Sequence, residues 1–194
     1  MKRDGHSSAE RCGRSYRKNI RAHLATAAAA PNSDAKGKAY EALAVCLFSG
    51  VPGCIVERDV TNPLGTEQID LAVGNRAGED GLFLLPRVFL VECKDWDRPV
   101  DSASVGYFLN ILAGRSIEVG ILIAANGITG GLWDKTNAHA LGLAAAPRGI
   151  RLIVITTKEI ASLSSVADFI DLLHHRLLRA YATGAVGAPL HRTS

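Results

Sequence analysis

The sequence predicts an α/β protein in which helices flank a central, mixed β-sheet. The chain has 194 residues, 47% of them hydrophobic, which suits one well-cored domain and is too short for two with a linker. Its apolar segments follow in the order helix, three strands, helix, strand, helix, strand and C-terminal helices. Short polar turns join the first three strands, whereas the later strands alternate with helices, as in parallel sheets. These features favour a sandwich of helices around a sheet with both strand directions.

The first core helix is predicted before Gly50, because apolar side chains recur there at helical spacing. Pro31-Asn32-Ser33-Asp34 precede it as a linker and cap. Two strands are predicted around residues 55–60 and 69–73, with a turn at Asn62-Pro63-Leu64-Gly65 between them. The buried face of the helix is expected to carry Tyr40, Leu43, Ala44, Leu47 and Phe48.

The later elements follow from the same two periodicities. A polar loop at residues 74–81 precedes them. The pattern Thr156-x-x-Glu159 is a capping box that opens the C-terminal helices, which Gly184 ends. Strands are predicted at residues 88–94, 117–125 and 150–155, and helices at residues 102–112 and 129–143.

The N-terminal segment, residues 1–35, is predicted to be a basic, loosely ordered arm. Residues 1–22 contain seven Lys and Arg against two acids, although the net charge of the chain is only +3. A short helix is expected at residues 16–29, where alanine is frequent and Pro31 stops it. The arm is a candidate for contacts with nucleic acid, and a solvated, mobile terminus is the alternative. The contact residues would be Arg11, Arg14, Arg17, Lys18 and Arg21.

Several classes of protein are disfavoured. No uninterrupted apolar stretch approaches the ~20 residues that span a bilayer, and the polar N-terminus lacks the apolar core of a signal peptide. We therefore expect a soluble, cytoplasmic protein with no membrane partner. The four cysteines show no C-x-x-C pair, so neither a disulfide framework nor a zinc site is indicated. They are Cys12, Cys46, Cys54 and Cys93.

Charged residues end two of the buried strands. Glu92 and Lys94 follow an apolar run and share one face of the strand, because alternate side chains point the same way. Cys93 points oppositely, into the apolar layer. Asp70 lies in the preceding strand, so two acids and a lysine are expected to converge. Such charges are costly to bury unless they are paired or form a site.

Asp70 followed by Glu92-Cys93-Lys94 resembles the signature of the PD-(D/E)-x-K nuclease superfamily, and most closely that of the Mrr-like restriction endonuclease catalytic domain. The early helix with Glu41 and the turn at residues 95–100 also resemble that domain, and the resemblance spans residues 36–160. It implies a restriction-endonuclease-like three-layer sandwich. The nuclease domain would cover residues 36–184, with a flexible tail at residues 185–194.

The resemblance also implies the chemistry. Mg²⁺, with Mn²⁺ as a substitute, would be held by Asp70, Glu92 and the backbone carbonyl of Cys93, which are hard oxygen ligands. Lys94 would orient or activate the attacking water, and Glu41 would support the metal site. The alternative interpretation is that Glu92 and Lys94 form a strand-edge ion pair while Asp70 caps a turn.

Other candidates are weaker. The helix after the third strand lacks the Gln that many Mrr-like domains carry, and the only Gln, Gln68, lies near Asp70. The amides of residues 126–131, beginning at Asn126, would contact a DNA phosphate at a helix N-terminus, or form a plain turn. Trp96 would stack on a base or pack over the strand end. His139 and the pair His174-His175 are interpreted as surface residues.

The sequence therefore predicts a magnesium-dependent endonuclease, a hydrolase of phosphodiester bonds in double-stranded DNA, acting in restriction and defence or in DNA processing. A homodimer or a separate specificity subunit would complete it. One alternative is a catalytically inactive DNA-binding or assembly module with the nuclease fold. A second is an RNA-directed nuclease of the same fold.

Overall fold

Five strands form one mixed sheet at the centre of the protein, and the computed structural model describes residues 5–130 and 138–187, with side chains from residue 15 onward. The strand order is β1-β2-β3-β4-β5. The first three strands pair antiparallel and the last three parallel, which confirms the predicted meander followed by crossover connections. The strands are β1 (Cys54–Thr61), β2 (Gln68–Asn75), β3 (Val88–Lys94), β4 (Val119–Ala124) and β5 (Arg151–Ile155).

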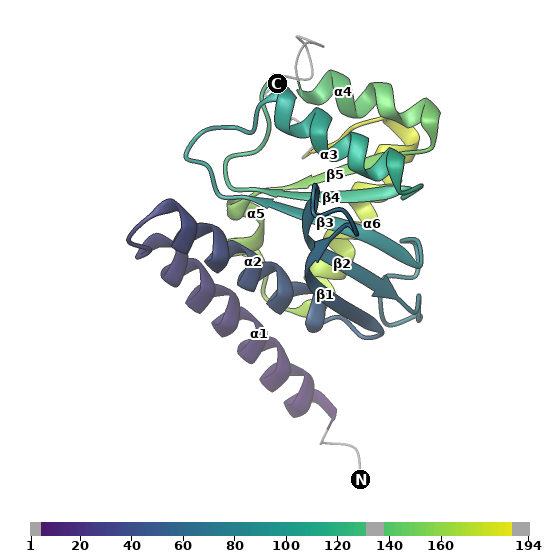
Figure 1. Cartoon of the computed structure of the whole chain (residues 1–194). Coiled ribbons are helices and arrows are strands. Elements are labelled where there is room, and N and C mark those ends of the chain that lie inside the picture. Colours follow the sequence, from purple (N-terminus) through teal and green to yellow (C-terminus); the bar gives the residue numbers. More distant parts are fainter. Residues whose placement is uncertain (1–4, 131–137, 188–194) are drawn as a thin grey trace, which may run out of the picture.

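Helices cover both faces of this sheet and give the fold its three layers (Figure 1). One face packs against α1 (Gly5–Ala28), α2 (Ser33–Ser49), α5 (Thr157–Ser162) and α6 (Val166–Thr183). The other face packs against α3 (Ser102–Gly114) and α4 (Ala138–Ala145), and a 3₁₀ turn, η1 (Ala146–Arg148), follows α4. The predicted α/β sandwich is confirmed.

Each face has its own hydrophobic core. On the α2 side, the Phe48 ring lies 5.6 Å from that of Phe89 and 5.1 Å from that of Phe169, centroid to centroid. On the α3 side, β4 approaches the helix so closely that a Cβ on Gly120 would collide with the Leu112 side chain. This close approach fixes α3 against the sheet, beside the end of β3.

The predicted helix boundaries are largely confirmed. The Asn32 side chain accepts a hydrogen bond from the Ala35 amide (2.8 Å) and caps α2. Thr156 and Glu159 form the expected capping box of α5. Gly184 ends α6 in the left-handed conformation, with φ of 71°, which glycine adopts without a steric penalty.

The N-terminal segment differs from the prediction. Helix α1 begins at Gly5 instead of near residue 16. Tyr16, Ile20 and Ala27 are buried, and the Tyr16 hydroxyl donates to the Leu47 carbonyl (3.2 Å). Tyr16, Ile20 and Ala27 are therefore part of the core, and from residue 16 onward the segment is a packed helix, in contrast to the expected loosely ordered arm. The three buried side chains recur at helical spacing, but the Ser, Gly and Arg residues around them obscured that periodicity. Where the nuclease domain begins stays a prediction.

Two C-terminal expectations also need correction. Residues 128–130 are not helical: Thr129 N–H donates to the Val100 carbonyl, and Val100 N–H to that of Gly127, both at 2.8 Å. Residues 131–137 of the predicted helix lie outside the described part, and α4 begins at Ala138.

The predicted tail is not free at its start, because Val186 is buried and its carbonyl accepts from Val154 N–H (2.6 Å) at the outer edge of β5. Residues 188–194 are not described.

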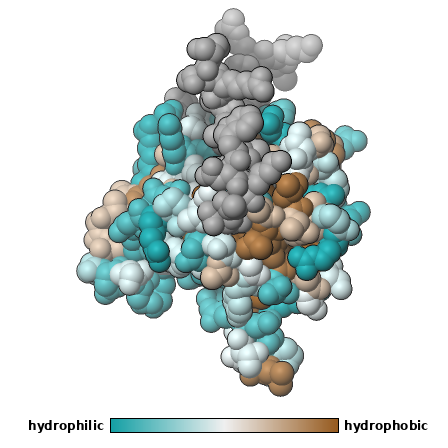
Figure 2. Space-filling view, turned by 90° about the horizontal axis from the view of Figure 1, so that it is seen from above, coloured by the Kyte–Doolittle hydropathy of each residue, from teal (hydrophilic) through white to brown (hydrophobic). Residues whose placement is uncertain are grey.

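The surface is polar over much of its area. Seen from above, the molecule is largely hydrophilic, with a hydrophobic area to one side (Figure 2). None of the helices within the described ranges combines the length and the apolar character that crossing a bilayer requires.

Candidate active site

The candidate site lies where β2 begins and β3 ends. The two strands are antiparallel, and the register that pairs Leu71 with Val91 brings Asp70 beside Glu92. The Asp70 carboxylate accepts a hydrogen bond from the backbone N–H of Cys93 (2.7 Å). The structure thus brings together the acids that the sequence predicted to converge, and a backbone hydrogen bond fixes the direction of Asp70.

Asp70 has an unusually high pKa for an aspartate. Burial and, to a lesser extent, the nearby Glu92 raise its pKa from 3.8 to about 6. The Cys93 amide and Lys94 oppose this rise without cancelling it. The two carboxylates therefore sit close together with too little positive charge around them.

Glu92 and Lys94 share the α3 face of β3, as strand alternation predicted. The Lys94 ammonium lies 2.8 Å from the Glu92 carboxylate. Burial lowers the pKa of Lys94, but Glu92 and Asp70 more than offset this effect and raise it above the ordinary value. Lys94 is consequently a charged donor at neutral pH and not a free base.

A small cleft lies between this pair and α3. It has a volume of about 230 Å³. The Asp101 side chain accepts from Ser104 N–H (2.9 Å) and caps the helix at the cleft. Tyr107 is 53% exposed at its rim. The cleft is lined by Glu92, Lys94, Ala103, Ser104, Tyr107, Phe108 and Ile111.

Cys93 points away from the cleft, toward α2. Its sulfur lies 3.9 Å from the Tyr40 carbonyl, to which it donates a weak hydrogen bond, and it packs against the α2-side core. Burial raises the pKa of this thiol well above its ordinary value, so it stays protonated. Only the backbone carbonyl of Cys93 is left as a ligand candidate.

Glu41 reaches the site from α2. Burial raises the pKa of Glu41, and Asp70 and Asp59 raise it further. Arg58 of β1 opposes this rise, and its guanidinium lies 3.6 Å from the Glu41 carboxylate. Glu41 is therefore close enough to Asp70 for the two charges to influence one another.

The sequence did not single out Arg58 and Asp59. Asp59 has φ of 52°, an uncommon conformation for a residue other than glycine, and its carboxylate accepts from the Gln68 side chain (3.2 Å). Gln68 thus contacts Asp59 and not Asp70. The available signal was the run Glu57-Arg58-Asp59, which breaks the alternation of polar and apolar residues in β1.

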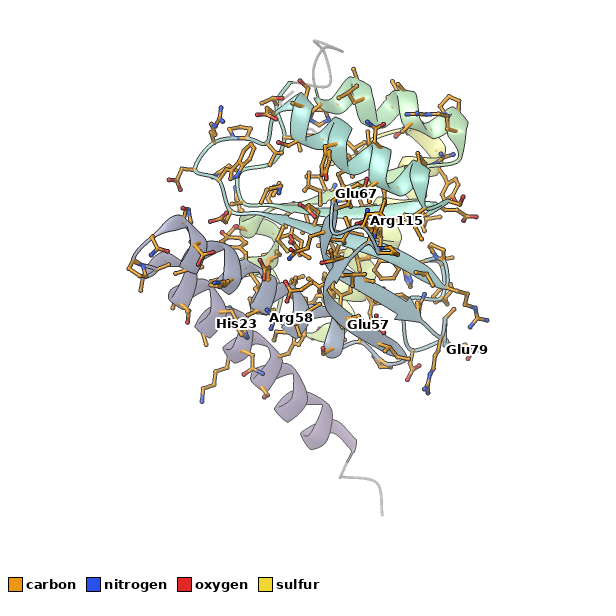
Figure 3. All side chains as sticks on the ribbon, in the orientation of Figure 1. His23, Glu57, Arg58, Glu67, Glu79 and Arg115 are labelled. Atoms are coloured by element: carbon orange, nitrogen blue, oxygen red, sulfur yellow. The ribbon has the colours of Figure 1, made fainter. Side chains whose placement is uncertain are left out.

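The turn between β1 and β2 is fastened beside the site. Asn62 accepts from Thr66 N–H (2.9 Å) and closes the turn. Glu67, just before β2, pairs with Arg115 at the end of α3 (3.4 Å), and Figure 3 labels both residues where the turn meets α3. These contacts hold the first residues of β2, and with them Asp70, in place.

The loop candidates have structural partners. The Asn126 side chain donates to the Trp96 carbonyl (2.7 Å), and Trp96 packs against the α3-side core with the Arg98 guanidinium 5.3 Å from its ring centre. Packing over the strand end, one of the two interpretations of Trp96, is thus observed. Asn126 joins two loops, and no helix starts within residues 126–130.

The sequence predicted that His139, His174 and His175 lie on the surface, and this prediction was wrong for His174. His174 is 8% exposed and packs edge-on against Phe83, with ring centres 4.5 Å apart, so it is not a surface residue. His139 is half-buried, and burial lowers its pKa. His175 is exposed, as expected.

The basic residues of α1 fall into two groups. Arg17, Lys18 and Arg21 are exposed. Arg11 and Arg14 lie within α1, but their side chains fall outside the described part. Because α1 packs along α2, which carries Glu41, its exposed cations are held on the same layer as one of the site acids (Figure 1).

The donor set fits a hard divalent cation. Asp70 and Glu92 offer carboxylate oxygens, and Cys93 offers a backbone carbonyl. Mg²⁺ commonly takes only one or two carboxylates and completes its shell with water and phosphate. Burial and the negative charge of Glu92 raise the pKa of Asp70, and a cation bound there would offset both effects. A fully enclosed centre is not present in the described residues, which contain no cluster of three or more His, Cys, Asp or Glu able to hold a metal.

Comparison with known families identifies the family of the chain. A family model of the Mrr catalytic domain, described as restriction endonuclease, matches residues 34–164, which include Glu41, Asp70, Glu92 and Lys94. A comparison with curated proteins finds no match. The matched region covers most of the chain, and the mixed sheet between helical layers has the restriction-endonuclease-like architecture. The chain therefore belongs to the Mrr-like restriction endonucleases of the PD-(D/E)-x-K superfamily.

Proposed function

We propose that the protein is a divalent-metal-dependent endonuclease that hydrolyses phosphodiester bonds in double-stranded DNA. Membership of a restriction endonuclease family indicates a DNA-cleaving hydrolase. The observation that carries the finer proposal is the adjacent pair Asp70 and Glu92: burial and the repulsion from Glu92 together raise the pKa of Asp70 to about 6. A divalent cation, Mg²⁺ or Mn²⁺ in its place, would relieve that repulsion.

Each residue has a role that follows from its contacts. Asp70 and Glu92 would hold the cation together with the Cys93 carbonyl, and the Cys93 amide keeps Asp70 oriented. When bound, the cation supplies Lewis acidity and an activated water. Lys94, fixed by Glu92 at 2.8 Å, donates to the attacking water or to the phosphate oxygens as negative charge develops. Glu41 supports the site from α2.

The basic residues of α1 would bind the DNA backbone. Arg17, Lys18 and Arg21 are exposed cations on a helix that is packed against the domain, so a contact with phosphate does not require ordering a free arm. Arg11 and Arg14, and more weakly Gln68 and Asn126, remain candidates from the sequence. Such backbone contacts add affinity and salt dependence but little sequence specificity. Specificity would then come from a second copy of the chain or a separate subunit.

Cleavage of supercoiled plasmid tests the proposal. Nicked or linear product is expected with Mg²⁺ or Mn²⁺, and none with EDTA. Tight DNA binding without cleavage under all metals would instead indicate a binding or assembly module. Faster cleavage of RNA than of DNA would indicate an RNA-directed nuclease. A role in restriction and defence would be supported if the active protein lowers phage infection or plasmid transformation and the Asp70→Ala variant does not.

A further inference from the structure

Arg58 is the cation next to Glu41, and it is held loosely. The ion pair spans 3.6 Å, beyond ordinary hydrogen-bond length. Within the described residues, this is the only ion pair of Glu41, and at 3.6 Å it is a long contact that still lowers the pKa of Glu41. Nearly half of the Arg58 side chain is exposed, 47% against 22% for Glu41. Arg58 can therefore leave Glu41 without breaking a buried contact.

The other cation at the site is held differently. Lys94 contacts Glu92 at 2.8 Å, and 29% of its side chain is exposed. The backbone of Arg58 is fixed by the pairing of β1 with β2, opposite Leu71. Figure 3 labels Arg58 on the side of β1 that faces α2. A fixed backbone with a mobile guanidinium group suits a residue that changes partner.

The charges around Arg58 do not balance. Asp70 and Asp59 lie close enough to Glu41 to raise its pKa, and Glu92 and Asp59 lie close enough to Asp70 to raise that of Asp70. Arg58 and Lys94 face them, while Lys38 is paired with Asp34 at 2.9 Å. Among the described residues, Arg58 is paired with Glu41 and Lys94 with Glu92, whereas Asp59 and Asp70 have no ion pair. A divalent cation at Asp70 and Glu92 would add positive charge beside Asp70, whose negative charge raises the pKa of Glu41, and Glu41 would then depend less on Arg58.

We propose that Arg58 is an exchangeable counter-ion that couples metal binding to DNA binding. It neutralises Glu41 while no metal is bound. A divalent cation at Asp70 and Glu92 takes over this function, and the released guanidinium binds a DNA phosphate beside the cleaved bond. A planar guanidinium suits this second partner, because it can donate two parallel hydrogen bonds to phosphate. This inference rests on the proposed function.

The exchange predicts changes of opposite sign. Without DNA, the positive charge of Arg58 neutralises Glu41 and repels a cation at Asp70 and Glu92. Removal of Arg58 should therefore tighten metal binding. With metal present, Arg58 contacts DNA, so its removal should weaken DNA binding. Coupling between two ligands is reciprocal, so the factor by which metal raises DNA affinity equals the factor by which DNA raises metal affinity, and the loss of Arg58 should reduce this factor. A residue that only supports the fold would weaken both.

The test uses Ca²⁺ as the metal probe and a short labelled duplex, with a gel to confirm that the DNA stays intact. Calorimetry gives the Ca²⁺ affinity of the full chain without DNA, and fluorescence anisotropy gives the DNA affinity in Ca²⁺ and in EDTA. The variants are Arg58→Gln and Arg58→Lys. Arg76→Gln is the matched control, because Arg76 is exposed and follows the opposite end of β2. Thermal unfolding checks that every variant is folded.

For Arg58→Gln we expect Ca²⁺ to bind about tenfold more tightly without DNA. The gain in DNA affinity on adding Ca²⁺ should shrink to about one third or less of the wild-type gain. Arg58→Lys should keep the wild-type Ca²⁺ affinity and lose part of the DNA affinity, and Arg76→Gln should change neither by more than about twofold. Weaker Ca²⁺ binding by Arg58→Gln, or an unchanged gain, would overturn the exchange. If the wild-type chain binds no divalent cation, the metal-dependent function itself is wrong, and the exchange with it.

Discussion

At the scale of single residues, the candidate site is expected to reduce the stability of the folded protein. Asp70 is directed by one backbone amide toward a second carboxylate, and its pKa of about 6 measures the cost of ionising it there. Functional groups of this kind commonly reduce stability in the absence of their ligand. The chemistry and the stability of Asp70 can therefore be separated experimentally.

Asp70→Asn should stabilise the metal-free protein at neutral pH. The carboxyl pKa is 3.8 ordinarily and about 6 in the fold, so ionisation destabilises the fold as pH rises between these values, and the full cost is present above pH 6. Moving a pKa this far corresponds to about 3 kcal/mol, and we expect a gain of about 1–3 kcal/mol at pH 7.5. Urea unfolding in EDTA measures it. The gain should almost vanish near pH 4, and a variant less stable than wild type at pH 7.5 would contradict this account.

Asp70→Ala, Glu92→Ala and Lys94→Ala should each abolish cleavage while the protein stays folded. The first two remove metal ligands and the third removes the donor to water and phosphate, and none of the three side chains fills a hydrophobic core. Plasmid cleavage with Mg²⁺ and circular dichroism give the two readouts. Normal cleavage by any two of these variants would show that the site lies elsewhere.

Cys93→Ala separates the two faces of β3. The sulfur packs on the α2 side, so its loss should reduce stability by roughly 1 kcal/mol. The backbone carbonyl remains, so cleavage at saturating Mg²⁺ should be retained. Denaturant unfolding and plasmid cleavage, measured on the same preparation, check both halves of the prediction. Inactivation comparable to that of Glu92→Ala would mean that the thiol itself takes part in the site.

At the scale of elements, the sequence predicted which side chains share a face of β3, but it did not predict which residues of α1 and β1 pack around them. Alternation in β3 was sufficient to place Glu92 and Lys94 on one face and Cys93 on the other, because strand geometry is local. Arg58 and Asp59 were missed, since their closeness to Glu41 depends on how α2 crosses β1. The core role of α1 was missed for a similar reason: Tyr16 and Ile20 are isolated apolar residues until α2 lies beside them.

Helix α1 should contribute affinity for DNA through Arg17, Lys18 and Arg21. Replacing all three with Gln removes charge without exposing the core, whereas deleting residues 1–30 would remove Tyr16 and Ile20 and destabilise the protein. If two or three of the cations contact phosphate, the slope of log affinity against log salt should become shallower by about 2–3.

Anisotropy titrations at several salt concentrations measure this slope. The matched control replaces three exposed arginines elsewhere, Arg76, Arg148 and Arg179, with Gln, and should change the slope little. Turnover at saturating DNA should persist in the α1 variant. An equal slope for the α1 variant and the wild type would mean that these cations face water in the complex.

At the scale of the whole molecule, the order of elements was predictable and two boundaries were not. The alternation of strand and helix patterns predicted a meander of three strands followed by crossover connections, and such connections leave few topologies open. The start of α4 and the position of residue 186 depend on contacts between distant parts of the chain. Val186 is a single branched apolar residue among glycine and alanine, which gives no helical or strand periodicity, and its burial comes from β5 and from Gly142 of α4.

The contact between Val154 and Val186 affects how the protein behaves among its own copies. A sheet of five strands has two outer edges, and an unpaired edge can recruit a strand from another chain. At β5 the chain occupies that edge itself, through the Val186 carbonyl. At β1 the edge carries Glu57, Arg58 and Asp59, whose charges disfavour stacking of strands. Both edges of the sheet are thus protected against pairing with another chain, one by a backbone hydrogen bond and one by charged side chains, and the charged edge also lies beside the candidate site.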